Sequence, residues 1–243
     1  AGRTKGLLAA NDGRYVLMSD DQRGMWLAAN GQGVMRASLR PPLFRHWAPP
    51  PGDAGQPANS HVRALWRDDT TPADDWTLWL STFDKTQWRL QLSPDGQVSS
   101  ARGYPLPADA VWDERAGFTR DNRNQLWFGT AAQLWRFDET AQTFKPVPVR
   151  WPESLQRPLI GGLHRDTEGT LWLYGNFGMA RQTGDGPAGW TFHPLPESAT
   201  QGLPEDFYID RLHVGSDGRW WIVSERGLLV FDPQHLQWQH VHS

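Results

Sequence analysis

The sequence predicts an all-β protein, a β-propeller built from four-stranded blades. Three observations support this prediction. A tryptophan-centred motif occurs five times, successive copies lie 45 to 53 residues apart, and each repeat reads as four short strands separated by turns. Repeats of this length with four strands per unit are typical of propellers. A lone four-stranded meander exposes two apolar faces, so it must stack on neighbours to bury them.

The composition agrees with this architecture and excludes several classes of function. The chain of 243 residues holds 24 glycines, 19 prolines and 15 tryptophans, which favours turns and aromatic core pieces over helices. The 24 basic and 27 acidic residues give a formal net charge of -3 without a concentrated basic block. We therefore expect no nucleic-acid partner and no membrane contact by this segment. The apolar runs are too short to span a bilayer, and the lack of cysteine excludes disulfides.

The first strand of a blade is predicted from apolar residues spaced three apart before an acidic turn. This spacing occurs in three of the repeats, and in one of them glycine replaces the acidic residue. The positions are Val62, Leu65 and Asp68; Ile160, Leu163 and Asp166; and Ile209, Leu212 and Gly215.

The second strand carries the recurrent tryptophan, whose size suits the packing layer between adjacent blades. Asp166 and Gly169 precede Trp172 by six and three residues, a spacing that predicts a tight hairpin. Aspartate accepts backbone N–H bonds there, and glycine permits positive φ. Asp121 holds the same place in its repeat, with Asn124 in the glycine position, a residue that also tolerates left-handed backbone. The tryptophans in this register are Trp26, Trp79, Trp127, Trp172 and Trp221.

The third strand follows as "QLWRFD" or "GLLVFD", and the fourth is short and aromatic, as in "TFKPV" or "WTFHPL". The blades then cover roughly residues 13–48, 60–107, 110–149, 158–197 and 207–243 of a single domain. Lys5–Asp12 resembles a third strand, so we expect an extra N-terminal strand, with the five repeats forming a small propeller or a piece of a larger one. A second register would start blade one at residue 4, but the aromatic residues that end this blade match the first register better.

The repeat resembles that of the two-component regulator propeller family, whose pattern runs I-x-x-I-x-x-D-x-x-G-x-L-W-x-G-T before a G-L pair and an aromatic strand. The matching stretches are "IGGLHRDTEGTLWLYG", "FTRDNRNQLWFGT" and "IDRLHVGSDGRWWIVS". The resemblance implies a periplasmic sensor domain, often paired with a second propeller or set in a long array. It also implies a transmembrane helix and a histidine kinase or diguanylate cyclase further along the full-length protein, with glycan fragments as a common ligand class. This sequence departs from the pattern at Gly215, and the Gly-Thr pair survives fully only at Gly129–Thr130.

Ligand-binding residues are expected on loops at one mouth of the propeller, between second and third strands and between successive blades. Aromatic faces beside amide and charged groups suit a sugar, whose C–H faces stack while its hydroxyls form hydrogen bonds. The alternative for each candidate is an ordinary loop residue. The candidates are Asn30, Asp84, Lys85, Trp112, Trp151, Asn176, Phe177, Tyr208, Glu225 and Arg226.

The sequence offers little for catalysis or metal binding, and we expect no catalytic residue, no metal and no cofactor. Adjacent acidic residues point to opposite faces of a strand, so they do not form the facing carboxylates of a glycosidase. His240 and His242 share a strand face, but no second source of metal ligands is evident. Phosphate-binding loops and nucleophile elbows are absent. The acidic pairs are Asp68/Asp69, Asp74/Asp75 and Asp113/Glu114.

The function expected from these features is that of a ligand-binding sensory domain in a bacterial signal-transduction protein, periplasmic or extracellular and non-catalytic. The expected ligand is a glycan fragment or another small molecule. The expected partners are a second propeller or a second copy in a homodimer, and a C-terminal signalling module in the full-length protein. Two alternatives stay open. A propeller lyase or glycosidase would need histidine, arginine and carboxylate clustered at one mouth, and a protein-interaction propeller would need an exposed aromatic patch.

Overall fold

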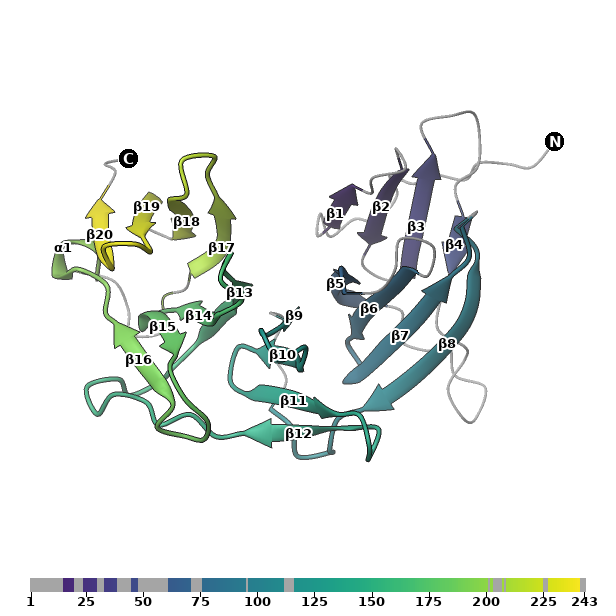
Figure 1. Cartoon of the computed structure of the whole chain (residues 1–243), viewed down its shortest axis with the longest axis horizontal. Coiled ribbons are helices and arrows are strands. Elements are labelled where there is room, and N and C mark those ends of the chain that lie inside the picture. Colours follow the sequence, from purple (N-terminus) through teal and green to yellow (C-terminus); the bar gives the residue numbers. More distant parts are fainter. Residues whose placement is uncertain are drawn as a thin grey trace. The chain divides into compact units, whose positions relative to one another are not determined.

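The computed structural model describes residues 15–19, 24–29, 33–38, 45–47, 61–70, 76–94, 96–111, 116–200, 202, 207, 209–224 and 227–240. Within these residues the strands form five four-stranded antiparallel sheets, and each sheet falls inside one predicted blade (Figure 1). The sheets follow chain order from first to fourth strand. The prediction of four-stranded blades is therefore confirmed.

Two compact units divide the chain, Ala1–Pro107 and Ala108–Ser243, and each is described by itself. The prediction of a single domain over the whole chain stays a prediction. The first unit holds blades one and two, and blade one begins as the preferred register predicts. The extra strand expected at Lys5–Asp12 lies outside the described residues. The strands of this unit are β1 (Tyr15–Ser19), β2 (Gly24–Ala29), β3 (Gly33–Ser38), β4 (Arg45–Trp47), β5 (Val62–Asp68), β6 (Trp76–Thr82), β7 (Thr86–Leu92) and β8 (Val98–Pro105).

The second unit holds blades three, four and five, with one short helix, α1 (Glu197–Thr200), between the last two. The first strand of blade four, β13, contacts the first strands of both neighbouring blades, β9 and β17. The strands of this unit are β9 (Ala116–Arg120), β10 (Leu126–Thr130), β11 (Leu134–Asp138), β12 (Thr143–Val147), β13 (Ile160–Arg165), β14 (Leu171–Gly175), β15 (Gly178–Gln182), β16 (Trp190–His193), β17 (Ile209–Val214), β18 (Trp220–Ser224), β19 (Gly227–Asp232) and β20 (Gln237–His240).

The hairpin between β13 and β14 has the predicted geometry and one bond that was not predicted. The Asp166 Oδ1 atom accepts the backbone N–H groups of Glu168 at 3.0 Å and Thr170 at 2.8 Å. Gly169 has a φ of 84°, as the turn requires. The second carboxylate oxygen, Oδ2, accepts the indole N–H of Trp172 at 2.8 Å. One aspartate thus fixes both the turn and the tryptophan side chain.

Blade three repeats this arrangement. The Asp121 Oδ1 atom accepts the backbone N–H groups of Arg123 and Gln125, both at 2.9 Å, and its Oδ2 atom accepts the indole N–H of Trp127 at 2.9 Å. Asn124 takes the left-handed position with a φ of 61°. The prediction that asparagine substitutes here for glycine is confirmed.

Three of the recurrent tryptophans form packing layers between blades, as predicted. Trp172 of blade four is 1 % exposed, and its ring centroid lies 5.0 Å from that of Trp220 and 5.9 Å from that of Phe231, both in blade five. Trp127 packs in the same way into the core that blade three shares with blade four, and Trp26 into the core shared by blades one and two. Trp221, by contrast, is only partly buried.

An arginine on the third strand lies opposite the recurrent tryptophan in four blades. The residue in that place in blade five is Val230, which pairs with Trp221. A guanidinium over an indole face contributes about 0.5–1 kcal/mol at exposed sites. The sequence analysis did not predict this pairing. The distances from the guanidinium carbon to the ring centroid are 5.8 Å for Arg36 and Trp26, 6.0 Å for Arg89 and Trp79, 5.9 Å for Arg136 and Trp127, and 5.6 Å for Arg181 and Trp172.

The first strand of blade two begins with a β-bulge. Val62 pairs with Thr82 of the next strand, and Ala64 pairs with the adjacent residue Ser81, so Arg63 is an extra residue with no partner position in the ladder. An extra residue of this kind shifts the alternation of side chains by one and increases the local twist.

The bulge explains the spacing of three seen in the sequence. A regular strand places residues i and i+2 on one face, but the inserted residue puts Val62 and Leu65 on the same face, where both pack into the core. The same shift occurs at Gly161 in blade four and Asp210 in blade five. The apolar pairs aligned in this way are Ile160 with Leu163 and Ile209 with Leu212.

The Asp166 hairpin predicts a specific cost on mutation. Asp166→Ala removes three hydrogen bonds, one of them to the indole of a buried tryptophan. We expect the free energy of unfolding, measured by urea titration with tryptophan fluorescence, to fall by about 1–3 kcal/mol. Among the described residues, Asp217 of blade five accepts one hydrogen bond, from the backbone N–H of Arg219 at 3.1 Å, and its Oδ2 atom lies 3.8 Å from Arg219 Nε on the surface. Asp217→Ala should therefore cost about 0.5 kcal/mol or less, and equal losses in the two variants would contradict this account.

Two histidines packed between blades four and five predict a loss of stability in mild acid. The His164 ring lies 4.7 Å from that of Trp220, and the His193 ring lies 5.8 Å from that of Trp172. Burial lowers the pKa of both side chains below the ordinary value of 6.5. Below that pH the unfolded chain binds protons that the folded chain excludes, so the free energy of unfolding should fall as the pH drops.

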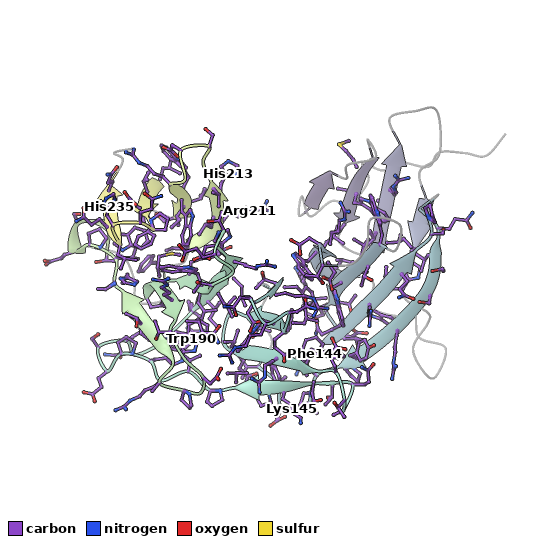
Figure 2. The ribbon with its side chains drawn as sticks, in the orientation of Figure 1. Phe144, Lys145, Trp190, Arg211, His213 and His235 are labelled. Atoms are coloured by element: carbon purple, nitrogen blue, oxygen red, sulfur yellow. The ribbon has the colours of Figure 1, made fainter. Side chains whose placement is uncertain are left out.

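Urea titrations between about pH 7.5 and pH 5 would measure this slope. We expect His164→Gln and His193→Gln each to make it shallower. His213 occupies the position in blade five that matches His164 but is exposed on β17 (Figure 2). A slope that stays unchanged in both variants would refute the assignment to burial.

Candidate functional site

In three blades, a hydrogen bond joins the hairpin between the second and third strands to the segment that precedes the first strand. Strand–strand hairpins and inter-blade segments therefore lie together at one end of these blades, as the sequence analysis expected. We call this the mouth end. The bonds are from the Phe83 N–H to the His61 carbonyl at 2.9 Å, from the Val111 N–H to Gln133 Oε1 at 3.0 Å, and from the Asn176 N–H to the Leu159 carbonyl at 3.2 Å.

At the mouth end of blade four, two of the predicted residues meet in an aromatic cluster. Trp151, on the connection from blade three, has its ring centroid 5.0 Å from that of Phe177 and 5.7 Å from that of Phe192. Phe177 and Phe192 are 5.8 Å apart in an edge-on arrangement. Phe177 is buried, whereas Trp151 is partly exposed. Of the two predicted rings, Trp151 therefore presents the surface that a ligand can reach.

The side chain of Asn176, also a predicted site residue, holds the loop beside this cluster. Its Oδ1 atom accepts the N–H of Leu159 at 2.8 Å, and its Nδ2 group donates to the carbonyl of Arg157 at 2.8 Å. The residue is 6 % exposed. The structure therefore gives Asn176 a positioning role, because its amide fastens the inter-blade segment to the hairpin.

At the mouth end of blade two, the predicted residues Asp84 and Lys85 form the hairpin turn. The Asp84 Oδ1 atom accepts the Thr82 hydroxyl at 2.6 Å and the Thr86 N–H at 3.1 Å. Lys85 has a φ of 65°, and its carbonyl accepts the N–H of Leu106 at 2.9 Å. The carboxylate and the left-handed residue together set the path of the hairpin.

Sequence reasoning missed three residues beside this turn, which we call the Phe83 cluster: His61, Arg63 and Phe83. Phe83 is 42 % exposed. The guanidinium carbon of Arg63 lies 5.0 Å from the Phe83 ring centroid, and the His61 ring lies 6.1 Å from it at an angle of 59°. The spacing of Val62 and Leu65 was the signal that a bulged residue lies between them.

The structure thus brings together Trp151, Asn176 and Phe177 in the second unit, and places Asp84 and Lys85 on one turn in the first. Ligand contact by any of these residues stays a prediction. Within the described ranges, no group of three or more histidine, aspartate or glutamate side chains could hold a metal ion. Among the same residues, no helix is long and apolar enough to cross a membrane. The other candidates, which lie outside the described residues, are Asn30, Trp112, Tyr208, Glu225 and Arg226.

Four-stranded blades that stack through a tryptophan layer define a β-propeller. No protein-family model matches the sequence, and no curated protein matches it. Among solved structures, the chain is similar to the extracellular domain of a hybrid two-component system from B. thetaiotaomicron, with a TM-score of 0.66 and 17 % identity over 93 % of this chain and 28 % of that one. It is also similar to PorZ, a surface component of the type-IX secretion system of Porphyromonas gingivalis, with a TM-score of 0.59 and 12 % identity over 93 % of this chain and 33 % of that one.

A third similar structure is YCF48 bound to D1 peptide, with a TM-score of 0.55 and 12 % identity over 96 % of this chain and 72 % of that one. At these identities the likeness is one of fold, and it confirms the predicted propeller class. The chain spans between a quarter and a third of the length of the first two structures.

The two hydrogen bonds of the Asn176 side chain predict that it stabilises the mouth end. Asn176→Leu keeps the size of the side chain but leaves the Leu159 N–H and the Arg157 carbonyl without these partners. We expect a loss of about 1–3 kcal/mol in the free energy of unfolding and faster hydrogen exchange across residues 157–160. Asn122→Leu, at an exposed turn position, is the matched control and should change neither measurement. Unaltered exchange in Asn176→Leu would show that the side chain does not hold the loop.

Proposed function

We propose that this chain is a ligand-binding sensory propeller of a bacterial signal-transduction protein, acting in the periplasm or outside the cell and without catalysis of its own. The observation that carries the proposal is the contrast between corresponding positions at the mouth end. Phe83 and Asn176 both donate their backbone N–H to the residue before the first strand. One presents an exposed phenyl ring and the other a buried amide. Variable side chains on a fixed backbone are the usual form of a binding surface.

The proposed mechanism is capture of a glycan fragment or another small molecule at the mouth end. In the first unit the exposed ring of Phe83 would stack on the C–H face of a sugar, while neighbouring polar groups bond its hydroxyls; in the second unit the partly exposed ring of Trp151 would do the same at a separate position. A ligand that binds one arrangement of the propeller better than another shifts the population between them. A second propeller or a second copy, and a C-terminal signalling module in the full-length protein, would read that shift. One of the similar structures supports this role, being the extracellular domain of a hybrid two-component system.

A ligand panel tests the proposal on the whole chain. Neutral oligosaccharides, acidic oligosaccharides, short peptides and small organic acids would each be added while the melting temperature is recorded. A ligand at a hundred times its Kd stabilises the folded state by about 2.7 kcal/mol, which raises the melting temperature by several degrees. We expect a sugar to give this shift without being consumed.

Each other outcome of the panel is also informative. A flat response across all classes would overturn the proposal. A response to peptides alone would favour the protein-interaction alternative, a reading that YCF48 bound to D1 peptide also suggests. Product formation from an oligosaccharide would show that the propeller is an enzyme.

A further inference from the structure

The sheet face of blade five that carries Trp221 is partly exposed, although the next blade covers the same face of blades three and four. Val223 on this face is 47 % exposed, and Trp221 is only partly buried. We propose that it is an interaction surface for a partner protein that presents carboxylate side chains. The inference goes beyond the proposed function, because it assigns a protein partner to a blade face and not a small ligand to the mouth end. We call the set Arg211, His213, Trp221 and Val223 the Trp221 face.

Strand pairing places these four side chains on one side of the sheet. His213 pairs with Trp221, and Arg211 pairs with Val223, in the ladder between β17 and β18. Residues directly opposite each other in an antiparallel pair project to the same side, as do residues i and i+2 of one strand. Arg211 and His213 are both exposed along β17 (Figure 2). A guanidinium and an imidazole therefore flank an indole and an apolar side chain.

The donor groups of the Trp221 face have no acceptor among the described residues. Within that part of the chain, no hydrogen bond or ion pair involves the Arg211 guanidinium, the His213 ring or the Trp221 indole N–H. A guanidinium carries five N–H donors and no acceptor, and an imidazole and an indole each add an N–H. The face therefore offers several donors and one fixed positive charge, which favours an anionic partner.

Two carboxylates at the turn end of blade five are bonded within their own hairpins. Asp217 accepts the backbone N–H of Arg219 at 3.1 Å and lies 3.8 Å from its Nε atom. Asp232, at the end of β19, accepts the backbone N–H groups of Gln234 at 2.9 Å and His235 at 3.1 Å, and it contacts the His235 ring at 2.8 Å. Each of these carboxylates thus has its partners beside it in the chain.

Blade four shows which acceptor the recurrent indole takes. The Asp166 carboxylate accepts the Trp172 indole N–H at 2.8 Å, and blade three has the same bond. Gly215 stands in the place of this aspartate in blade five, where an added Cβ atom would lie 2.9 Å from Trp221 Nε1. The Trp221 indole therefore lies against its turn without the carboxylate that the repeat supplies elsewhere. A carboxylate from a partner would complete the same interaction.

The residues of this face also differ from those of a face covered by another blade. In blade three, Gly117 and Gly129 hold the places of Arg211 and Val223. Blade four packs closely there, since a Cβ atom added at Gly129 would come within 2.5 Å of Leu163. The longer side chains of blade five do not allow the same packing. A partner of different shape, with the opposite charge, fits this face better than another copy of the repeat.

An extended segment with glutamates at alternate positions matches the spacing of these donors. Residues i and i+2 of a strand are about 6.6–6.8 Å apart, so Arg211 and His213 can each meet one carboxylate of such a segment. The glutamate CH₂ groups can then lie on Trp221 and Val223. Recognition would combine charge with apolar contact, as is usual at protein interfaces.

Two capped seven-residue peptides test the proposal on the full chain, one of alternating threonine and glutamate and one with glutamine in place of glutamate. Hydrogen bonds to charged groups are strong enough to change affinity about ten- to hundred-fold. We expect the glutamate peptide to bind at least about ten-fold more tightly than the glutamine peptide, measured by fluorescence anisotropy of labelled peptide. We also expect it to shift the Trp221 indole N–H resonance in NMR spectra.

Variants of the face separate charge from packing. Arg211→Gln should lower the affinity for the glutamate peptide by about ten-fold and leave the glutamine peptide unaffected. Arg211→Lys keeps the charge but loses the planar fork, so an intermediate affinity should result. Trp221→Phe keeps an aromatic ring without the N–H and should weaken the glutamate peptide about five-fold. Melting temperatures check that each variant is folded, and the exposed Arg211 carries the test if Trp221→Phe is not.

Arg150 provides the matched control. It is an exposed arginine on the connection from blade three to blade four, so Arg150→Gln makes the same change of charge away from the Trp221 face. This variant should bind the glutamate peptide as the unchanged chain does. The inference is overturned if the two peptides bind equally, if neither binds, or if Arg150→Gln weakens binding as much as Arg211→Gln. None of these results bears on sugar binding at the mouth end, which the ligand panel tests separately.

Discussion

The structure of the second unit depends on the bond between a hairpin aspartate and the indole of a core tryptophan. The distance is 2.8 Å from Trp172 to Asp166 and 2.9 Å from Trp127 to Asp121. A buried indole N–H without a hydrogen-bond partner destabilises the folded state, and this offsets the stabilisation gained by burying the indole ring. Because the same carboxylate also closes the turn, the bond aligns the hairpin with the layer between blades. In blades three and four, the recurrent tryptophan can then be buried without loss of a hydrogen bond.

Blade five differs from blades three and four at these positions. Gly215 stands in the place of the aspartate, Val230 stands in the place of the arginine, and Trp221 between them is only partly buried. Its neighbour Trp220 lies on the opposite face of the strand, where it is 3 % exposed and contacts Trp172 of blade four. The repeat in the sequence predicted the position of the second-strand tryptophan correctly in all five blades. The burial of that tryptophan also depends on which residues cover its face of the sheet.

The repeat, the hairpins and the tryptophan layer could be predicted from sequence because they depend on residues close together in the chain. The bulge could not be predicted from sequence, because it depends on how residues of two strands pair with each other. The three-residue spacing of Val62 and Leu65 was the only indication of it. The arginine opposite the recurrent tryptophan in four blades was missed because it belongs to the next strand, beyond a hairpin whose sequence differs between blades. Asn176 was chosen for its place in a variable loop, and only the structure shows its amide fastening that loop to the blade.

Two ways of holding the mouth end explain why its chemistry can differ between blades. Blade four uses the Asn176 side chain in addition to the backbone bond to Leu159, and the residue is therefore buried. Blade two has the corresponding backbone bond from Phe83 to His61, while its turn is closed by Asp84 instead. The side chain of Phe83 is then not needed for the fold and can lie at the surface. Recognition can vary at such positions because the bonds that position the loop come from other groups.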